Sequence, residues 1–222
     1  MAKGWGRYRW LDYPALLTRY MRPPQELVGI KCFTALMTHQ PDKYVRQEQY
    51  LRALEVRGGI ENLPGKFTSR RVHCRKCGKW FRVPQEKRTY VNLATHLVAD
   101  AFDDSFDTFL LCTADSDLVP AVRYVQERFE KRFFLIDPPR RHSDELSEIA
   151  DLRLRSREQF FRQSQLPDPV EYATPRGQTK RIHRPASWGT SEVADAWSEP
   201  DDAGIVYCLS CHRPWPDGDP ET

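Results

Sequence analysis

The sequence contains no long apolar segment. Its 222 residues hold no run approaching the roughly 18 uninterrupted apolar residues of a membrane-spanning helix. The opening stretch MAKGWGRYRW also lacks the apolar core of a signal peptide. These absences argue against a membrane partner and against export. We therefore expect a cytoplasmic protein whose cysteines stay reduced.

The chain also lacks a strong excess of charge. Its 34 Lys and Arg residues nearly balance its 31 Asp and Glu residues, which gives a net charge of +3. The overall charge therefore does not require a nucleic-acid partner. Local clusters of basic residues are either solvated surface or contacts to a phosphate backbone. The two clusters comprise Arg70, Arg71, Arg75, Lys76, Lys79 and Arg82, and then Lys180, Arg181 and Arg184.

Hydrophobic residues are somewhat scarce for a chain of this length. They make up 40% of the sequence, which suffices for one core and leaves part of the chain outside it. The composition favours one domain over residues 1–165, with a small insertion at about residues 68–84. Residues 166–204 are rich in Pro, Ser, Thr, Gly and charge, and we expect a flexible linker there. Residues 205–216 recover apolar and cysteine content.

The clearest fold signal lies in the middle of the chain. Apolar residues recur at helical spacing over 91–102, and the continuous apolar run 108–112 follows. A second helical stripe over 118–129 leads to a second apolar run at 133–136. This alternation predicts an α/β fold with parallel strands and crossover helices. Further elements are expected as helices over 10–21, 42–57 and 143–161, and as strands over 26–36 and 60–67.

Four of the six cysteines form two Cys-x-x-Cys pairs. Cys74 and Cys77 lie in the expected insertion, and Cys208 and Cys211 lie near the end of the chain. Each spacing directs two thiolates at one ion, so the two pairs together predict a closed tetrahedral Zn²⁺ site. Because four sulfurs fill the coordination shell, this zinc is expected to be structural. Two inert pairs or a redox dithiol are the alternatives.

The other two cysteines have a simpler interpretation. Cys32 and Cys112 lie inside apolar segments, and we expect both to be small core residues. His73 and His212 each adjoin a Cys-x-x-Cys pair, but the four cysteines already supply a complete zinc shell.

An acidic pair follows the apolar run 108–112. Asp115 and Asp117 lie in the segment TADSDLVPAV, and functional loops of parallel sheets gather beyond the carboxyl ends of strands. Two carboxylates in one turn can hold Mg²⁺ or Mn²⁺, and such an ion can activate water for attack on a phosphodiester. In the structural alternative, Asp117 caps the helix that begins at Leu118. One residue can serve both purposes.

The central segment resembles the signature of the NYN domain family. The residues that carry the resemblance are EKRTYVNLATHLVADAFDDSFDTFLLCTADSDLVPAV, from Glu86 to Val122. The segments WLDYPAL, RQEQYLRAL, PPRRHSDEL and SQLPDPV extend it to about residues 10–170. The resemblance implies a PIN-like Rossmannoid fold of three layers with a mostly parallel sheet. It also implies metal-dependent cleavage of RNA, with Asp115 and Asp117 matching the acidic pair of the family.

Two features depart from the family pattern. Members usually begin with a strand that ends in Asp-Gly-x-Asn, and MAKGWGRYRW contains no such motif. The first strand is therefore expected to be missing, through a late start or a truncation. Tyr90 stands where the family usually has an Asp, and a neutral phenol is a poor Mg²⁺ ligand.

These observations leave three hypotheses. The chain is a metal-dependent ribonuclease that uses Asp115 and Asp117, with the basic residues Arg70, Arg71, Arg75, Lys76 and Lys79 contacting RNA. Alternatively, it is a non-catalytic module of the same fold that binds RNA or a protein partner. A homo-oligomer is an open alternative under each hypothesis. A purely structural or regulatory zinc protein is the third hypothesis.

Overall fold

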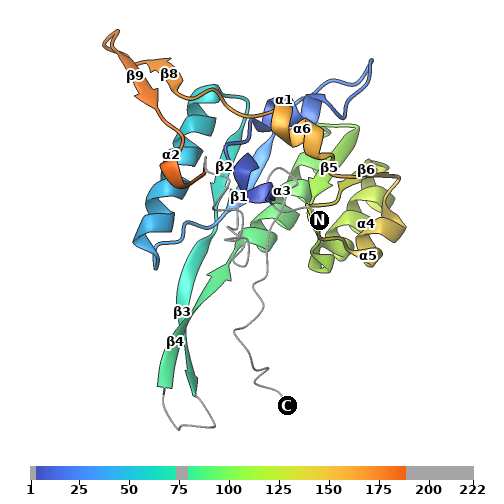
Figure 1. The fold of residues 1–222 in the computed structure, drawn as a ribbon. Coiled ribbons are helices and arrows are strands. Elements are labelled where there is room, and N and C mark those ends of the chain that lie inside the picture. The colour runs from blue at the N-terminus through green and yellow to red at the C-terminus, as the bar shows by residue number, and fades with distance from the viewer. Residues whose placement is uncertain (1–3, 74–79, 189–222) are drawn as a thin grey trace.

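The computed structural model describes residues 4–73 and 80–188, and these residues form a mixed α/β fold (Figure 1). The strands are β1 (Lys31–Thr34), β2 (Glu61–Pro64), β3 (Lys66–His73), β4 (Trp80–Lys87), β5 (Thr108–Cys112), β6 (Arg132–Ile136), β7 (Leu152–Leu154), β8 (Val170–Ala173) and β9 (Thr179–Ile182). The helices are η1 (Trp5–Tyr8), α1 (Tyr13–Thr18), α2 (Pro41–Arg57), α3 (Thr89–Phe102), η2 (Ser116–Leu118), α4 (Val119–Phe129), α5 (Asp144–Ile149), α6 (Glu158–Gln163) and η3 (Ala186–Trp188).

Parallel strand pairs form the centre of the fold. β1 pairs with β2, and β5, β6 and β7 form a second parallel group in that order. Each parallel pair is connected through a helix. In the sequence α2 lies between β1 and β2, α4 lies between β5 and β6, and α5 lies between β6 and β7. The predicted α/β fold with parallel strands and crossover helices is therefore confirmed.

Two hydrophobic cores lie on opposite faces of these strands. Successive strand residues point to opposite faces, and Cys32 belongs to the first core whereas Phe33 belongs to the second. The first core packs under η1, α1, α2, α6 and η3, and the second under α3, α4 and α5. Helices therefore cover both faces, which gives a three-layer arrangement.

The parallel strands form two hydrogen-bonded groups that share both cores. In β1, backbone groups of even-numbered residues face β2, as the 2.8 Å hydrogen bond from Gly65 N to Thr34 O shows. In β5, backbone groups of odd-numbered residues face β6, as the 3.1 Å hydrogen bond from Arg132 N to Asp107 O shows. Within residues 4–73 and 80–188, no strand is paired with both β1 and β5. The two groups therefore each end in a strand edge, at β1 and at β5.

Local chemistry explains several element boundaries. Asp12 caps α1, because its carboxylate accepts a hydrogen bond from Ala15 N at 3.0 Å. α2 has Pro41 in its first turn and ends at Gly58, which has a φ of 77°. The expected strand over 60–67 is divided at Gly65 into β2 and β3, and the expected strand over 26–36 is reduced to β1.

The segment 166–188 differs from the expected flexible linker. It forms the β8–β9 hairpin and η3, and Trp188 is only 7% exposed. The Trp188 ring lies 6.4 Å from the ring of Trp10 and 5.5 Å from that of Tyr50. This apolar contact holds the segment on the first core, a relationship that local composition does not reveal. Residues 189–204 of the expected linker and the segment 205–216 lie outside the described residues.

The longest described helix, α2, spans 17 residues. Within the described ranges, no helix is long and apolar enough to cross a membrane.

Candidate functional site

The acidic pair lies in the turn that follows β5. Asp115 N–H donates to Thr113 Oγ1 at 3.1 Å, and Asp115 Oδ1 accepts a hydrogen bond from Asp117 N–H at 2.9 Å. Asp115 is half-buried and Asp117 is exposed. Both carboxylates therefore lie at the carboxyl end of a parallel strand, where open α/β sheets bind ligands.

The capping residue differs from the sequence-based expectation. Asp115, rather than Asp117, caps the turn, and the element that it caps is η2. α4 begins one residue later than expected, at Val119, and its N-cap residue Leu118 makes no side-chain capping bond. The carboxylate of Asp117 is therefore not used for helix capping.

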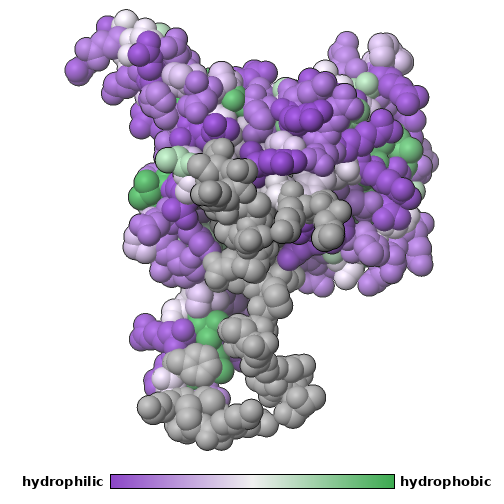
Figure 2. Space-filling model, viewed as in Figure 1, coloured by the Kyte–Doolittle hydropathy of each residue, from purple (hydrophilic) through white to green (hydrophobic). Residues whose placement is uncertain are grey.

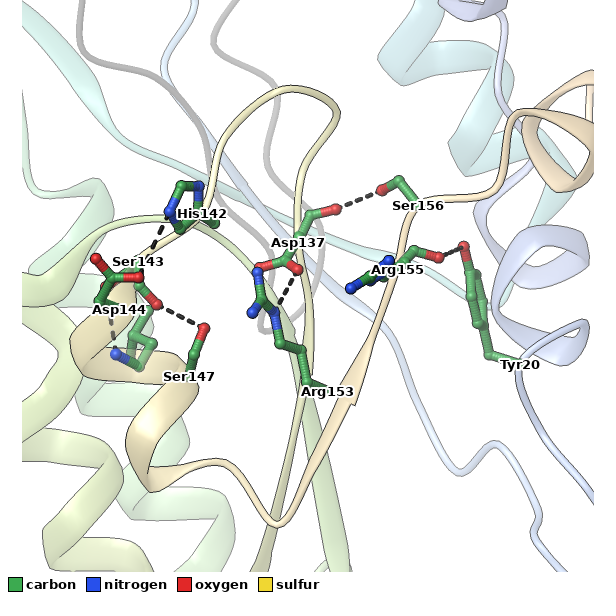
Figure 3. A network of polar contacts seen from close by, with 10 residues as sticks. Tyr20, Asp137, His142, Ser143, Asp144, Ser147, Arg153, Arg155 and Ser156 are labelled. Atoms are coloured by element: carbon green, nitrogen blue, oxygen red, sulfur yellow. Dashed lines mark hydrogen bonds and ion pairs between the residues drawn. The ribbon is translucent and has the colours of Figure 1, made fainter.

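Asp137 is a third carboxylate at this end of the strands. It directly follows β6 and is 8% exposed, and its Oδ2 accepts a hydrogen bond from Arg153 Nε at 2.7 Å (Figure 3). Its backbone carbonyl accepts a hydrogen bond from the Ser156 hydroxyl. Asp137 Oδ1 is buried and has no hydrogen-bond partner among the described residues. Sequence reasoning missed this residue, although its position after an apolar run parallels that of Asp115.

The carboxylate oxygens after β5 and β6 meet some of the requirements for binding a small divalent cation. Carboxylate oxygens are the ligands that Mg²⁺ and Mn²⁺ prefer. However, residues 4–73 and 80–188 contain no group of three or more His, Cys, Asp or Glu side chains that could hold a metal ion. The set fits an ion bound by one or two carboxylates that keeps several waters and takes substrate phosphate, which is a common arrangement for Mg²⁺.

Tyr90 occupies the second position of α3. Its ring is half-buried and packs against the second core, so it contributes apolar area there. The neighbouring Asn92 side chain donates to Pro64 O at 3.4 Å.

A long hairpin projects from the body of the protein. β3 and β4 pair over eight residues each, and this arm extends away from the layers of helices and strands (Figure 1). Two contacts fix its base: the Phe67 ring lies 4.8 Å from the His39 ring, and Glu86 accepts a hydrogen bond from the Thr89 hydroxyl. Arg70, Arg71 and Arg82 are exposed on the arm, so the first basic cluster lies on a protruding surface.

The two basic clusters differ in their surroundings. In the second, Arg181 Nε lies 2.7 Å from Glu171, and Arg184 Nε lies 3.7 Å from Asp168. Within residues 66–73 and 80–87, no Arg or Lys forms an ion pair with a carboxylate of the described chain. The arm therefore presents its positive charge to solvent, where a phosphate backbone can reach it.

Several expected site residues cannot be placed. Cys74, Cys77, Cys208 and Cys211, together with Arg75, Lys76 and Lys79, lie outside the described residues. Cys32 is fully buried, and burial raises the pKa of its thiol to about 12. Cys32 is thus a core residue, as expected, and Cys112 is partly buried against the same core.

Comparison with known proteins gives one family and one solved structure. Residues 3–156 match the NYN domain. A crystal structure of a protein of unknown function from Vibrio parahaemolyticus RIMD 2210633 is similar at 21% sequence identity and a TM-score of 0.46. The match covers 67% of this chain and 80% of that one. No curated protein sequence matches the chain.

Proposed function

We propose, on the premise that the chain belongs to the NYN domain family, that it hydrolyses RNA phosphodiesters with Mg²⁺ or Mn²⁺ held by Asp115 and Asp117. The family implies a PIN-like ribonuclease fold. The observation that supports the activity most directly is the turn after β5. There the Asp115 carboxylate accepts a hydrogen bond of 2.9 Å from Asp117 N–H, at the carboxyl end of a parallel strand.

The residues of the site have separate roles in this proposal. Asp115 shapes the turn and offers its carboxylate from a half-buried position, whereas Asp117 offers a carboxylate exposed to substrate. A divalent ion bound there would supply a water of lowered pKa and would offset charge on the phosphate under attack. The carboxylate of Asp137 forms an ion pair with Arg153 at 2.7 Å, so its charge is balanced and we assign the ion to Asp115 and Asp117 alone.

The basic arm supplies the contact to RNA. Arg70 and Arg71 are exposed and free of ion pairs within the described chain, so they suit the phosphate backbone. The expected RNA contacts Arg75, Lys76 and Lys79 follow them directly in the sequence. In this proposal the arm binds the RNA, and the turn after β5 cleaves it.

Cleavage of single-stranded RNA in the presence of Mg²⁺ or Mn²⁺ tests the activity. Asp115→Asn and Asp117→Asn keep the side-chain shapes and remove the charges, so both should abolish cleavage. Asp103→Asn, at an exposed aspartate after α3, is the matched control and should cleave normally. The proposal fails if the wild-type protein cleaves no RNA with either metal, or if both variants cleave at the wild-type rate.

A non-catalytic module that binds RNA is the second candidate. Tyr90 in place of the usual family Asp, and the lack of a three-carboxylate group among the described residues, favour it. This candidate predicts RNA binding that weakens with salt and survives Asp115→Asn. Measuring binding and cleavage on the same variants separates the two candidates.

We also propose that a structural Zn²⁺ joins Cys74 and Cys77 to Cys208 and Cys211. The spacing of the two pairs supports this proposal. Metal analysis of purified protein should give one zinc per chain, and Cys74→Ser combined with Cys208→Ser should remove it. Cys112→Ala is the control and should keep the zinc. Protein that contains no zinc when purified without chelator contradicts the proposal.

A further inference from the structure

We propose that the β3–β4 arm binds single-stranded RNA by stacking a base on Trp80, while Arg71 and Arg82 hold the adjoining phosphates. The proposal rests on the proposed function in one respect, namely that RNA is the ligand. It names the class of RNA and the residues that select it. We call the side chains of Arg71, His73, Trp80 and Arg82 the Trp80 face.

The pairing of the two strands brings these side chains onto one face. Arg71 lies opposite Arg82, and His73 lies opposite Trp80 in the antiparallel register. Directly opposed residues project on the same side of a hairpin, as do residues two apart on one strand. The Trp80 face is therefore a contiguous group of one large aromatic ring, two guanidinium groups and an imidazole.

Trp80 is held by its neighbours and is exposed. Of the four Trp residues that the structure describes, Trp10 and Trp188 are buried and Trp5 is half-buried, whereas Trp80 is 60% exposed. The His73 ring lies 4.9 Å from the Trp80 ring, and Arg71 Cζ lies 5.1 Å from the centre of that ring. These neighbours restrict the indole rotamer and leave much of its area open to a flat ligand.

The charge around Trp80 selects a polyanion. The described arm carries the exposed cations Lys66, Arg70, Arg71, Arg82 and Lys87. Its single carboxylate, Glu86, lies at the base and bonds to Thr89. The β3–β4 ribbon projects away from the layers of helices and strands (Figure 1), so these cations lie on a protruding element. Hydrophilic residues make up most of the described surface that is visible in the space-filling view (Figure 2).

An exposed aromatic ring among cations distinguishes single strands from duplexes. Unpaired bases have free faces that stack on aromatic side chains whatever their sequence, whereas the bases of a duplex are already stacked on each other. The arginines interact with phosphates of either form. Trp80 should therefore contribute to binding of single strands only, and Arg71 and Arg82 should contribute to both.

Binding in EDTA tests this without any contribution from cleavage. Fluorescence anisotropy would compare a labelled oligouridine with a blunt RNA duplex of the same length. Trp80→Ala should weaken oligouridine binding by roughly 5- to 150-fold, the range expected from loss of one stacked base. It should leave duplex binding unchanged. Trp80→Phe keeps an aromatic face and should retain most of the affinity, whereas Trp80→Leu should behave like Trp80→Ala.

Salt dependence separates stacking from charge. Trp80→Ala should leave the slope of log affinity against log salt unchanged, whereas Arg82→Ala should reduce its magnitude by about 0.7, one phosphate contact of a single strand. Phe102→Ala removes an exposed aromatic ring from α3 and is the matched control. It should bind both RNAs as the wild type does. Thermal unfolding of each variant would confirm that the fold is intact.

Three outcomes overturn the inference. One is unchanged oligouridine binding by folded Trp80→Ala or Trp80→Leu, and another is an equal loss of duplex binding. The third is a wild-type protein that binds neither RNA. The arm would then be a candidate binding surface for a protein partner. Because the assay contains no metal, a failed cleavage assay with normal oligouridine binding would refute only the proposed catalytic activity.

Discussion

Asp115 Oδ1 accepts a hydrogen bond of 2.9 Å from the backbone N–H of Asp117, so the first carboxylate of the acidic pair holds the turn that carries the second. The two aspartates are consequently unequal. Asp115 serves both as cap and as candidate metal ligand, whereas the carboxylate of Asp117 is exposed and takes no part in the cap. Substitutions at the two positions should therefore differ in stability even where they agree in activity.

Replacing Asp115 with Ala should destabilise the protein, whereas Asp117→Ala should not. Loss of a capping side chain costs about 0.5–2 kcal/mol, and exposed substitutions away from such features usually change stability by less than about 0.5 kcal/mol. Asp115→Asn keeps a capping oxygen and should retain near wild-type stability. Urea unfolding measures these differences. Equal stability of Asp115→Ala and the wild type would show that the bond contributes nothing.

Gly65→Ala should disrupt the junction between β2 and the arm. A Cβ atom at Gly65 would collide with the Thr89 hydroxyl and would lie 3.1 Å from Lys87 O. The backbone oxygen cannot move aside cheaply, so we expect a loss of about 1–3 kcal/mol. Urea unfolding would measure it. Gly29→Ala, where the added atom meets nothing within 4 Å, is the control. Similar stability of both variants would contradict this account.

Trp188→Ala should remove a substantial part of the first core. Truncating a buried aromatic side chain costs about 3–5 kcal/mol, and the Trp188 ring contacts both Trp10 and Tyr50. Its indole nitrogen is buried without a partner among the described residues, so Trp188→Phe should cost less than Trp188→Ala. Val91→Ala, at an exposed valine, is the control. A Trp188→Ala variant as stable as this control would show that η3 adds nothing to the core.

Stability should fall as the pH rises above about 9. Burial raises the pKa of Cys32 from 9.0 to about 12, so between these values the folded thiol keeps a proton that the unfolded chain has lost. Folding then becomes less favourable by about 1.4 kcal/mol per pH unit for this group. Burial also raises the pKa of Tyr50 well above its usual value, which acts in the same direction above about pH 10.

Urea unfolding of the wild type and of Cys32→Ala between pH 8 and pH 10 checks this assignment. The variant should lose less stability over that interval, because it lacks the buried thiol. A thiol reagent at pH 8 should also leave Cys32 unmodified in the folded protein, since so little thiolate is present. Rapid modification of Cys32 without unfolding would refute the raised pKa of its thiol. Identical pH dependence of stability in the two proteins would refute it as well.

The middle of the fold could be predicted from the sequence because its pattern is local. The apolar run 108–112 coincides with β5, and the run 133–136 lies within β6. The helical stripe over 91–102 lies within α3. These elements contribute buried residues to the second core at regular spacing. The spacing of apolar residues in the sequence therefore indicates which face of each element is buried.

Other elements depend on distant contacts that no local pattern contains. Leu27 and Val28 are apolar and were expected in a strand, yet they are 40% and 74% exposed and lie outside β1. Residues 170–182 are polar in composition, yet they form a hairpin. The expected helix over 143–161 is divided into α5, β7 and α6, since β7 pairs with β6.

The candidate site was located from sequence only in part. Asp115 and Asp117 follow β5 as expected, because an apolar strand that ends in a polar turn is visible in the sequence. Asp137 was overlooked, since its burial and its bond to Arg153 arise from the pairing of β6 with β7. The metal ions remain predictions, as do the zinc ligands.

The packing of Trp10 has a consequence for synthesis of the chain. Trp10 Nε1 donates to Pro167 O, 157 residues later, at 2.9 Å, and its ring meets Trp188. Contacts between such distant segments close late and slow folding. Trp10 can meet Tyr50 early in synthesis, but its contacts to Pro167 and Trp188 must wait until the ribosome has translated nearly all of the described chain.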